Sequence, residues 1–159
     1  MVRNPRLIDA SLMDATTAAA QSSPRRRRNF NLHSNECDVS NRLLNAVEPG
    51  SYIPPHRHLD PTKDESFVVL RGRLGLLCFD ADGKVTLKAT MAAGTDVVGA
   101  DIPMGIFHSL VSLEPGSLFF ETKAGPYCAI ADKERAPWAP HEGDPGAVAY
   151  LTWMESLFR

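Results

Sequence analysis

Residues 50–72 read GSYIPPHRHLDPTKDESFVVLRG, and this stretch decides how the rest of the chain is interpreted. One residue separates His56 from His58, and Glu65 follows seven positions after His58. A later histidine, His108, closes the segment PMGIFH. Imidazole and carboxylate ligands suit divalent ions such as Fe, Mn, Ni, Cu or Zn. We therefore expect a divalent-metal site with the ligands His56, His58, Glu65 and His108.

The two paired histidines are expected on an extended strand. Side chains two positions apart on a strand point to the same face, so His56 and His58 should face one side and Arg57 the other. The two prolines that precede them stiffen the backbone that carries them. Two nearby carboxylates stay open as alternatives to Glu65, namely Asp60 and Asp64.

Short apolar runs separated by Gly, Pro and Asp predict a series of strands in the middle of the chain. A hairpin turn is expected at Asp82-Gly83, because glycine readily adopts the positive φ of a two-residue turn. The sequence shows no alternation of strands with helices, which favours an antiparallel barrel or sandwich over a parallel sheet. The strands are expected at Arg42–Val47, Ser66–Leu70, Leu74–Phe79, Val85–Lys88, Asp96–Gly99, Phe107–Leu113 and Leu118–Lys123.

The N-terminal part is expected to be a helix followed by a basic arm. Residues 1–24 include an alanine-rich stretch, a weak capping box from Ser11 to Asp14 and a stop at Pro24. Four arginines follow at residues 25–28. We interpret them as a solvated linker or a subunit arm. A nucleic-acid contact and a clamp on an anionic substrate remain alternatives.

The C-terminal part is expected to begin as a loop and end as a helix. Asp144 is the expected N-cap, and Pro145 suits the first helical position, where its missing N–H is not needed. An apolar stripe at three- and four-residue steps should pack on the barrel or on a second subunit. It consists of Val148, Leu151, Met154 and Phe158.

The composition excludes several classes of protein. A length of 159 residues suits one domain, and 43% hydrophobic and 23% charged residues are ordinary for a globular chain. The net charge of −2 gives no general attraction to nucleic acid or membranes. No apolar run is long enough to span a bilayer or to form the core of a signal peptide. Cys37, Cys78 and Cys128 form no CxxC pair, so neither a thiolate zinc site nor a disulfide framework is expected. We expect a cytoplasmic protein.

The order of the candidate ligands resembles the motifs of the cupin family. The first motif is matched by Gly50, His56, His58, Glu65 and Gly72. Six residues separate His58 from Glu65, where the family has three or four. The second motif is matched by Pro103, Gly105 and His108, whereas Val97 and Ser112 replace its first glycine and its closing asparagine.

Longer segments resemble the WbuC family of small cupin metalloproteins. They are RNFNLH at residues 28–33, RLLN at 42–45, SYIPPHRH at 51–58 and APWAP at 136–140. The resemblance implies an all-β fold, a single cupin barrel (a double-stranded β-helix or jelly roll) with helices at both ends. We expect a helix and basic arm at residues 1–35, the barrel at 36–125 and a C-terminal loop and helix at 126–159. Members occur in bacterial polysaccharide gene clusters, so the resemblance implies polysaccharide metabolism.

Other residues are candidates for the walls of the barrel. Interior and exterior positions alternate along barrel strands, so Glu121 and Lys123 share one face. If that face points inward, they form an acid–base pair beside the metal, and the alternative is an exterior ion pair. Tyr127 is the third catalytic candidate, with simple packing as its alternative. The substrate-binding candidates are Tyr52, Asn31 and His33, joined by Asn29 if the arm crosses the barrel mouth; His33 and His141 are otherwise surface residues or lie behind the ligands.

Three functions remain open. The first is a metal-dependent enzyme acting on a small polar molecule such as a sugar or nucleotide-sugar, by isomerisation, epimerisation or iron-dependent dioxygen chemistry; an anionic ligand is one option. The second is a non-catalytic, metal-dependent binding module. The third, a metal-free sugar epimerase, is disfavoured because it does not need four converging ligands. A homodimer is expected, because the amphipathic C-terminal helix and the arm have few predicted partners in their own chain.

Overall fold

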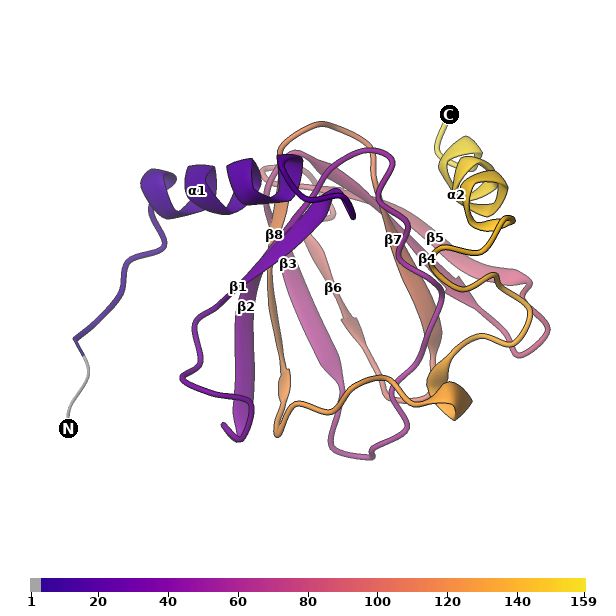
Figure 1. Ribbon diagram of the computed structural model, residues 1–159, viewed down its shortest axis with the longest axis horizontal. Coiled ribbons are helices and arrows are strands. Elements are labelled where there is room, and N and C mark those ends of the chain that lie inside the picture. Colours follow the sequence, from indigo (N-terminus) through magenta and orange to yellow (C-terminus); the bar gives the residue numbers. More distant parts are fainter. Residues whose placement is uncertain (1–3) are drawn as a thin grey trace.

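Two antiparallel sheets face each other in the computed structural model, which describes residues 4–159 (Figure 1). The first sheet has the strand order β1 (Arg27–Asn31), β2 (Ser40–Val47), β8 (Ser117–Ala124), β3 (Glu65–Arg71) and β6 (Gly99–Ile102). The second has the order β5 (Val85–Ala92), β4 (Arg73–Phe79) and β7 (Phe107–Ser112). Helix α1 (Ala10–Gln21), the short 3-10 helix η1 (Asp132–Glu134) and helix α2 (Ala147–Ser156) complete the chain. The predicted all-β fold with a helix near each end is confirmed.

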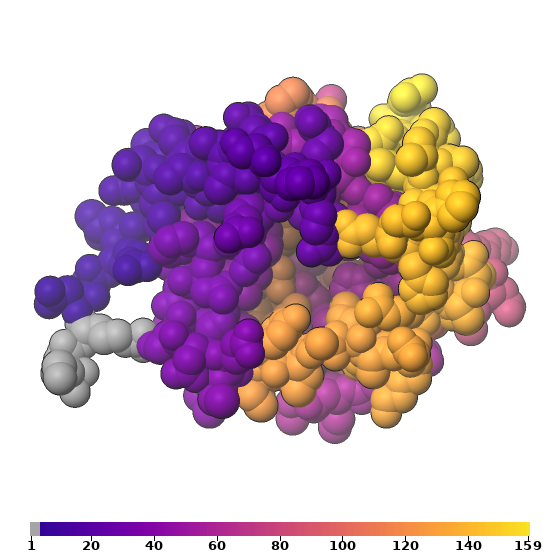
Figure 2. Space-filling view, viewed as in Figure 1, coloured from indigo at the N-terminus to yellow at the C-terminus, as the bar shows by residue number. Residues whose placement is uncertain are grey.

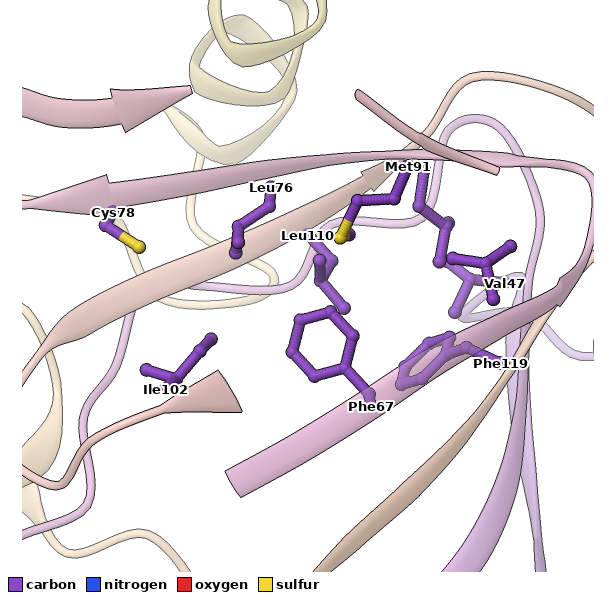
Figure 3. Packing of buried hydrophobic residues seen from close by; sticks show 10 residues of the cluster. Val47, Phe67, Leu76, Cys78, Met91, Ile102, Leu110 and Phe119 are labelled. Carbon is purple, nitrogen blue, oxygen red and sulfur yellow. The ribbon is translucent and has the colours of Figure 1, made fainter. Parts of the chain in front are cut away.

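The main core lies between the two sheets (Figure 3). The rings of Phe67 on β3 and Phe119 on β8 meet edge to face, with centroids 5.6 Å apart. Leu76 and Met91 close the core from the second sheet. The apolar residues fill one end of the space between the sheets, and the polar residues described below line the other. This division leaves room for a site inside the barrel.

The predicted strands match the structure except at the sheet edges. Six of the seven expected runs overlap observed strands over most of their length. The hairpin at Asp82-Gly83 is confirmed, with Gly83 at φ +84°, but its loop runs from Asp80 to Lys84 and is longer than the expected two-residue turn. The run Asp96–Gly99 is wrong, because β6 begins only at Gly99 and the preceding residues turn back toward Ala92. Strand β1 was not predicted, since its sequence RRNFN is polar and exposed along one edge.

Helix α1 covers the outer face of β1 and β2 (Figure 1). Ala20 is fully buried there, against Leu44 and Leu118. Asp9, whose side chain accepts a hydrogen bond from the backbone N–H of Leu12, is the N-cap. The capping box expected at Ser11 is therefore wrong, whereas the predicted stop before Pro24 is confirmed. Residues 1–3 of the predicted helix lie outside the described residues.

Helix α2 packs on the outer face of the smaller sheet. Leu151 and Met154 are buried against β4 and β7, as expected, but Val148 is 76% exposed and Ala147 takes its place in the stripe. The helix begins after Gly146, and the expected cap by Asp144 is wrong. The Asp144 carboxylate instead accepts a hydrogen bond from the backbone of His141, one turn earlier. Because this face of α2 is covered by its own barrel, the helix needs no partner subunit for packing.

Neither helix within residues 4–159 is long and apolar enough to cross a membrane. Cys37, Cys78 and Cys128 are free thiols.

Candidate metal centre

The four predicted ligands meet inside the barrel. One ligand atom from each of His56, His58, Glu65 and His108 lies within 4.8 Å of the other three. Glu65 is the first residue of β3 and His108 is the second residue of β7, so the two sheets each supply a ligand. The paired histidines come from the connection between β2 and β3. Three of the four side chains are buried, and His56 is partly buried. Their predicted convergence is confirmed.

The backbone around the paired histidines is not the strand that the sequence predicts. His56 forms isolated bridges with His108 and with Arg135, and no strand continues through His58. The bridge with His108 is closed by two backbone hydrogen bonds, of 3.1 and 2.8 Å. Arg57 nevertheless points away from the two histidines, as expected. Its guanidinium lies 4.4 Å from the centre of the Phe107 ring. The bridge between His56 and His108 therefore positions two ligands that come from different sequence motifs.

Hydrogen bonds orient the imidazole rings toward the centre. Nδ1 of His56 lies 3.0 Å from the carbonyl oxygen of Pro54, and Nδ1 of His108 lies 2.9 Å from that of Ile106. A carbonyl oxygen only accepts, so Nδ1 carries the proton and Nε2 offers its lone pair. Metal-binding histidines are commonly held in this way. The donor set and its orientation fit a divalent ion.

The carboxylate of Glu65 links the histidines. Its Oε2 lies 2.9 Å from Nε2 of His58 and 3.5 Å from Nε2 of His108. Burial works to raise the pKa of Glu65, but its close contacts with His108 and His58 and the charge of Lys123 hold the pKa well below its usual range. Burial, together with the neighbouring His108, lowers the pKa of His56 to about 3. Both groups are therefore in their ligand forms, an ionised carboxylate and a neutral imidazole, at neutral pH.

Glu121 and Lys123 point inward from β8, which agrees with the expected pair beside the metal and not with an exterior ion pair. Nζ of Lys123 lies 2.8 Å from Oε1 of Glu121 and 3.7 Å from Oε1 of Glu65. Asn45 on β2 donates a 2.7 Å hydrogen bond to the other oxygen of Glu121. Burial and the charge of Glu65 raise the pKa of Glu121 to about 7. Burial works to lower the pKa of Lys123, but the two carboxylates outweigh it and raise it.

A cavity of about 280 Å³ opens beside these groups. Its walls include His56, Glu65, His108, Glu121 and Lys123, with Phe67 and Phe119 at the apolar end. Arg25, Arg27 and Arg28 also line it, at the end where the chain enters β1. On the face of the molecule shown in Figure 2, a hollow lies between the N-terminal and C-terminal parts of the chain.

Most of the other predicted site residues lie away from this cavity. Tyr52 is buried against α2 and donates its hydroxyl to the Pro140 carbonyl. Tyr127 is 53% exposed and does not line the cavity. Asn31 and His33 line a different hollow, beside the segment that precedes α1. The catalytic role expected of Tyr127 and the substrate roles expected of Tyr52, Asn31 and His33 therefore find no support in their positions.

The alternatives to the ligands are also placed elsewhere. Asp60 caps the backbone of Thr62, and Asp64 accepts a hydrogen bond from the backbone of Met104. His141 is exposed. Of Asn29, Asn31 and His33, only Asn29 reaches the cavity wall. Asn45 was not singled out as a site residue from the sequence, although an amide inside the apolar run from Leu43 to Val47 was the available signal.

Comparison with known proteins agrees with this architecture. A solved oxalate oxidase in complex with the substrate analogue glycolate is 17% identical with a TM-score of 0.55, covering 87% of this chain and 75% of that one. KdgF from Halomonas sp. is 18% identical with a TM-score of 0.51, covering 67% of this chain and 85% of that one. The conserved protein SPY1581 from Streptococcus pyogenes is 13% identical with a TM-score of 0.51, covering 80% of this chain and 93% of that one. Identities this low establish a shared fold alone. No curated protein matches the chain.

An antiparallel barrel that gathers three histidines and a glutamate in its interior has the cupin-type jelly-roll fold with a candidate metal centre. The single-cupin jelly roll predicted from the sequence is thereby confirmed. The chain belongs to the family described as "Domain of unknown function (DUF6016)", whose model matches residues 8–91. That match spans α1, the paired histidines and Glu65, and ends in β5.

Proposed function

We propose that the protein is a metal-dependent enzyme that binds a divalent ion through His56, His58, Glu65 and His108 and acts on a small polar molecule in the adjoining cavity. The observation that carries the proposal is that three of the four ligands, His56, Glu65 and His108, line the same cavity as the Glu121–Lys123 pair. A bound ion would polarise a carbonyl or hydroxyl oxygen as a Lewis acid or, if it is iron, support dioxygen chemistry.

The chain's own residues supply proton transfer and charge. The Glu121 carboxylate is held at a fixed position by Asn45 and Lys123, as a general base must be to abstract a proton from a bound molecule. The Lys123 ammonium lies between Glu121 and Glu65 and would stabilise an oxygen that becomes negative. This arrangement favours epimerisation, in which one carbon loses and regains a proton, or isomerisation, in which the proton removed from one carbon is returned to its neighbour.

The size of the cavity favours a small substrate. Ligand pockets commonly measure roughly 300–1,000 Å³, and a volume of about 280 Å³ lies just below that range. A single sugar unit suits this space, whereas the nucleotide of a nucleotide-sugar would extend outside it. The resemblance of four sequence segments to the WbuC family supports a role in polysaccharide metabolism.

A non-catalytic, metal-dependent binding module is the second candidate. It is favoured by the close pairing of Glu121, which is already bonded to both Asn45 and Lys123. Such a satisfied network serves equally well as a rigid polar wall.

A turnover screen separates the two candidates. Metal-loaded protein would be incubated with phosphorylated sugars, sugar acids and nucleotide-sugars, and products detected by mass spectrometry or by deuterium exchange from solvent. If a substrate is found, Glu121→Gln should lower kcat by about 10²-fold or more, the usual range for a general base. Substitution of Glu155 by Gln is the control and should leave kcat unchanged, because Glu155 lies on α2 and does not line the cavity. Turnover that survives Glu121→Gln would remove Glu121 from the reaction.

A further inference from the structure

Three arginines at one end of the cavity have no role in the metal centre. Arg25, Arg27 and Arg28 line the cavity together with three of the four candidate ligands. Two acidic side chains line it as well, Glu65 and Glu121, but Lys123 and the histidines engage both of them. The arginine end of the cavity is therefore positive, and the only carboxylate that pairs with it among residues 4–159 comes from outside the cavity wall.

That carboxylate is Glu142, in the loop before α2. Arg25 grips it with two parallel hydrogen bonds, from Nε at 2.8 Å and from Nη2 at 2.6 Å. Nη2 of Arg27 donates a third, at 2.9 Å. A guanidinium fork of this kind matches a carboxylate or a phosphate, and the same geometry would hold either group on a ligand.

The two arginines differ in how firmly they are held. The Arg27 side chain is 17% exposed, and its Nη1 also donates to the carbonyl of Tyr52 at 2.9 Å and to Ser51 Oγ at 3.3 Å. The Arg25 side chain is 61% exposed, and its only side-chain hydrogen bonds within the described residues are those to Glu142. Arg27 is thus a fixed donor, and Arg25 is free to follow whichever anion it grips.

Arg28 and the Glu142 loop leave room for exchange. The guanidinium of Arg28 makes no hydrogen bond or ion pair with any residue between 4 and 159 and is exposed, so one cation on the cavity wall has no partner among these residues. Glu142 is 36% exposed and its backbone makes no hydrogen bond in the same part of the chain. Little besides the two arginines holds the carboxylate in place.

We propose that Arg25, Arg27 and Arg28 form an anion subsite at the cavity mouth, and that Glu142 occupies it until the carboxylate or phosphate group of a ligand displaces it. This inference rests on the proposed function, because it assigns the substrate class of the same cavity: a small molecule with one anionic end at the arginines and its polar part toward the metal ligands. Glu142 then acts as a built-in competitor, and it ties the N-terminal arm to the C-terminal segment while the subsite lacks a ligand.

Anion binding by full-length variants tests the subsite. Inorganic phosphate and acetate would be titrated into each protein by isothermal calorimetry at low ionic strength, with folding checked by circular dichroism. Glu142→Gln removes the competing charge and should tighten binding of phosphate, acetate or both about tenfold; the anion that gains more identifies the preferred group. Arg27→Met should weaken binding at least tenfold. Arg26→Met is the matched control and should change affinity less than about twofold, because Arg26 belongs to the same basic run but bonds Pro49 and does not line the cavity.

Two results would overturn the subsite: unchanged or weaker anion binding in folded Glu142→Gln, or equal losses in Arg26→Met and Arg27→Met. If Arg27→Met does not fold, Arg28→Met gives the same test, because Arg28 has no structural bonds to lose.

His56→Ala separates this proposal from the proposed function. If His56→Ala lacks metal but still binds phosphate, the arginines and not the ion hold the anion. If phosphate binding is lost together with the metal in His56→Ala, the subsite is contradicted, whereas the proposed metal centre is not.

Discussion

At the scale of single residues, the structure distinguishes glycines that resemble each other in sequence. Gly83 and Gly94 both adopt positive φ, +84° and +74°. A Cβ on Gly83 would lie 2.7 Å from the indole ring of Trp138, whereas a Cβ on Gly94 would meet no atom within 4 Å. The two positions therefore share the backbone cost of an alanine and differ in the space available for it.

Alanine substitutions at these two glycines measure that difference. The left-handed conformation costs a non-glycine residue about 1–2 kcal/mol, so Gly94→Ala should lower the free energy of unfolding by about that amount. Gly83→Ala should cost at least about 1 kcal/mol more, because the indole ring must move. Urea denaturation gives both values. Equal losses would show that Trp138 does not pack over the turn as described.

The ligands themselves were predictable because their chemistry is unusual. His56, His58 and His108 are three of the five histidines in the chain. In an antiparallel barrel, packing alone does not account for their spacing with Glu65, whereas a metal site does. Tyrosine carries no such signal. Tyr52 is buried because its hydroxyl finds the carbonyl of Pro140, 88 positions away, and no local pattern predicts that contact.

At the scale of elements, helix starts were the least predictable feature. Asp, Ser and Thr all favour the N-cap position, so Asp9 and Ser11 compete on nearly equal terms in the sequence. The observed N-cap, Asp9, lies two residues before the expected one. The polar edge strand β1 was missed for a related reason, since edge strands carry little of the apolar alternation by which strands are recognised.

The corrected cap gives a direct prediction. Asp9→Ala removes the hydrogen bond to the backbone of Leu12 and should lower the free energy of unfolding by about 1 kcal/mol. Ser11→Ala lies inside the helix and should change it by less than about 0.5 kcal/mol. Chemical denaturation of both variants decides between the two caps, and a larger loss for Ser11→Ala would restore the capping box that the sequence favours.

At the scale of the whole molecule, the contact between Arg25 and Glu142 joins segments 117 residues apart. No sequence pattern predicts it, although the arginine run itself was visible. The hydrogen bonds from Arg25, with those from Arg27, lower the pKa of Glu142 below 4.5 despite partial burial. A carboxylate whose pKa is lower in the folded state stabilises the fold above its unfolded pKa, and loses that contribution as the pH falls through the folded value.

The pH dependence of stability therefore reports on this contact. The difference in Tm between the wild-type protein and Glu142→Gln should be constant from pH 6 to pH 8 and should shrink as the pH falls below about 4.5, the unfolded pKa of a glutamate. Thermal denaturation in buffers across this range measures it. A difference that persists unchanged at pH 3 would mean that Glu142 is not held by the arginines.

The predicted homodimer stays a prediction. Its original basis is weaker, because α2 packs on its own barrel and the arm forms β1. Val68, which is 44% exposed, and Ile8, which is 41% exposed, nevertheless leave an apolar area on the outer side of the larger sheet. Light scattering should give twice the chain mass of 17.4 kDa. A mass equal to that of one chain would refute the dimer.

The central claim is that His56, His58, Glu65 and His108 together hold one divalent ion. Elemental analysis of protein purified without chelators tests it most directly, with His56→Ala and the exposed His141→Ala compared side by side. The wild-type protein and His141→Ala should each carry about one transition-metal ion per chain, whereas folded His56→Ala should lose most of it, since removal of one of four protein ligands weakens any such site. A wild-type protein without metal after incubation with Fe, Mn, Ni and Zn salts, or a His56→Ala variant with its full metal content, would contradict the account.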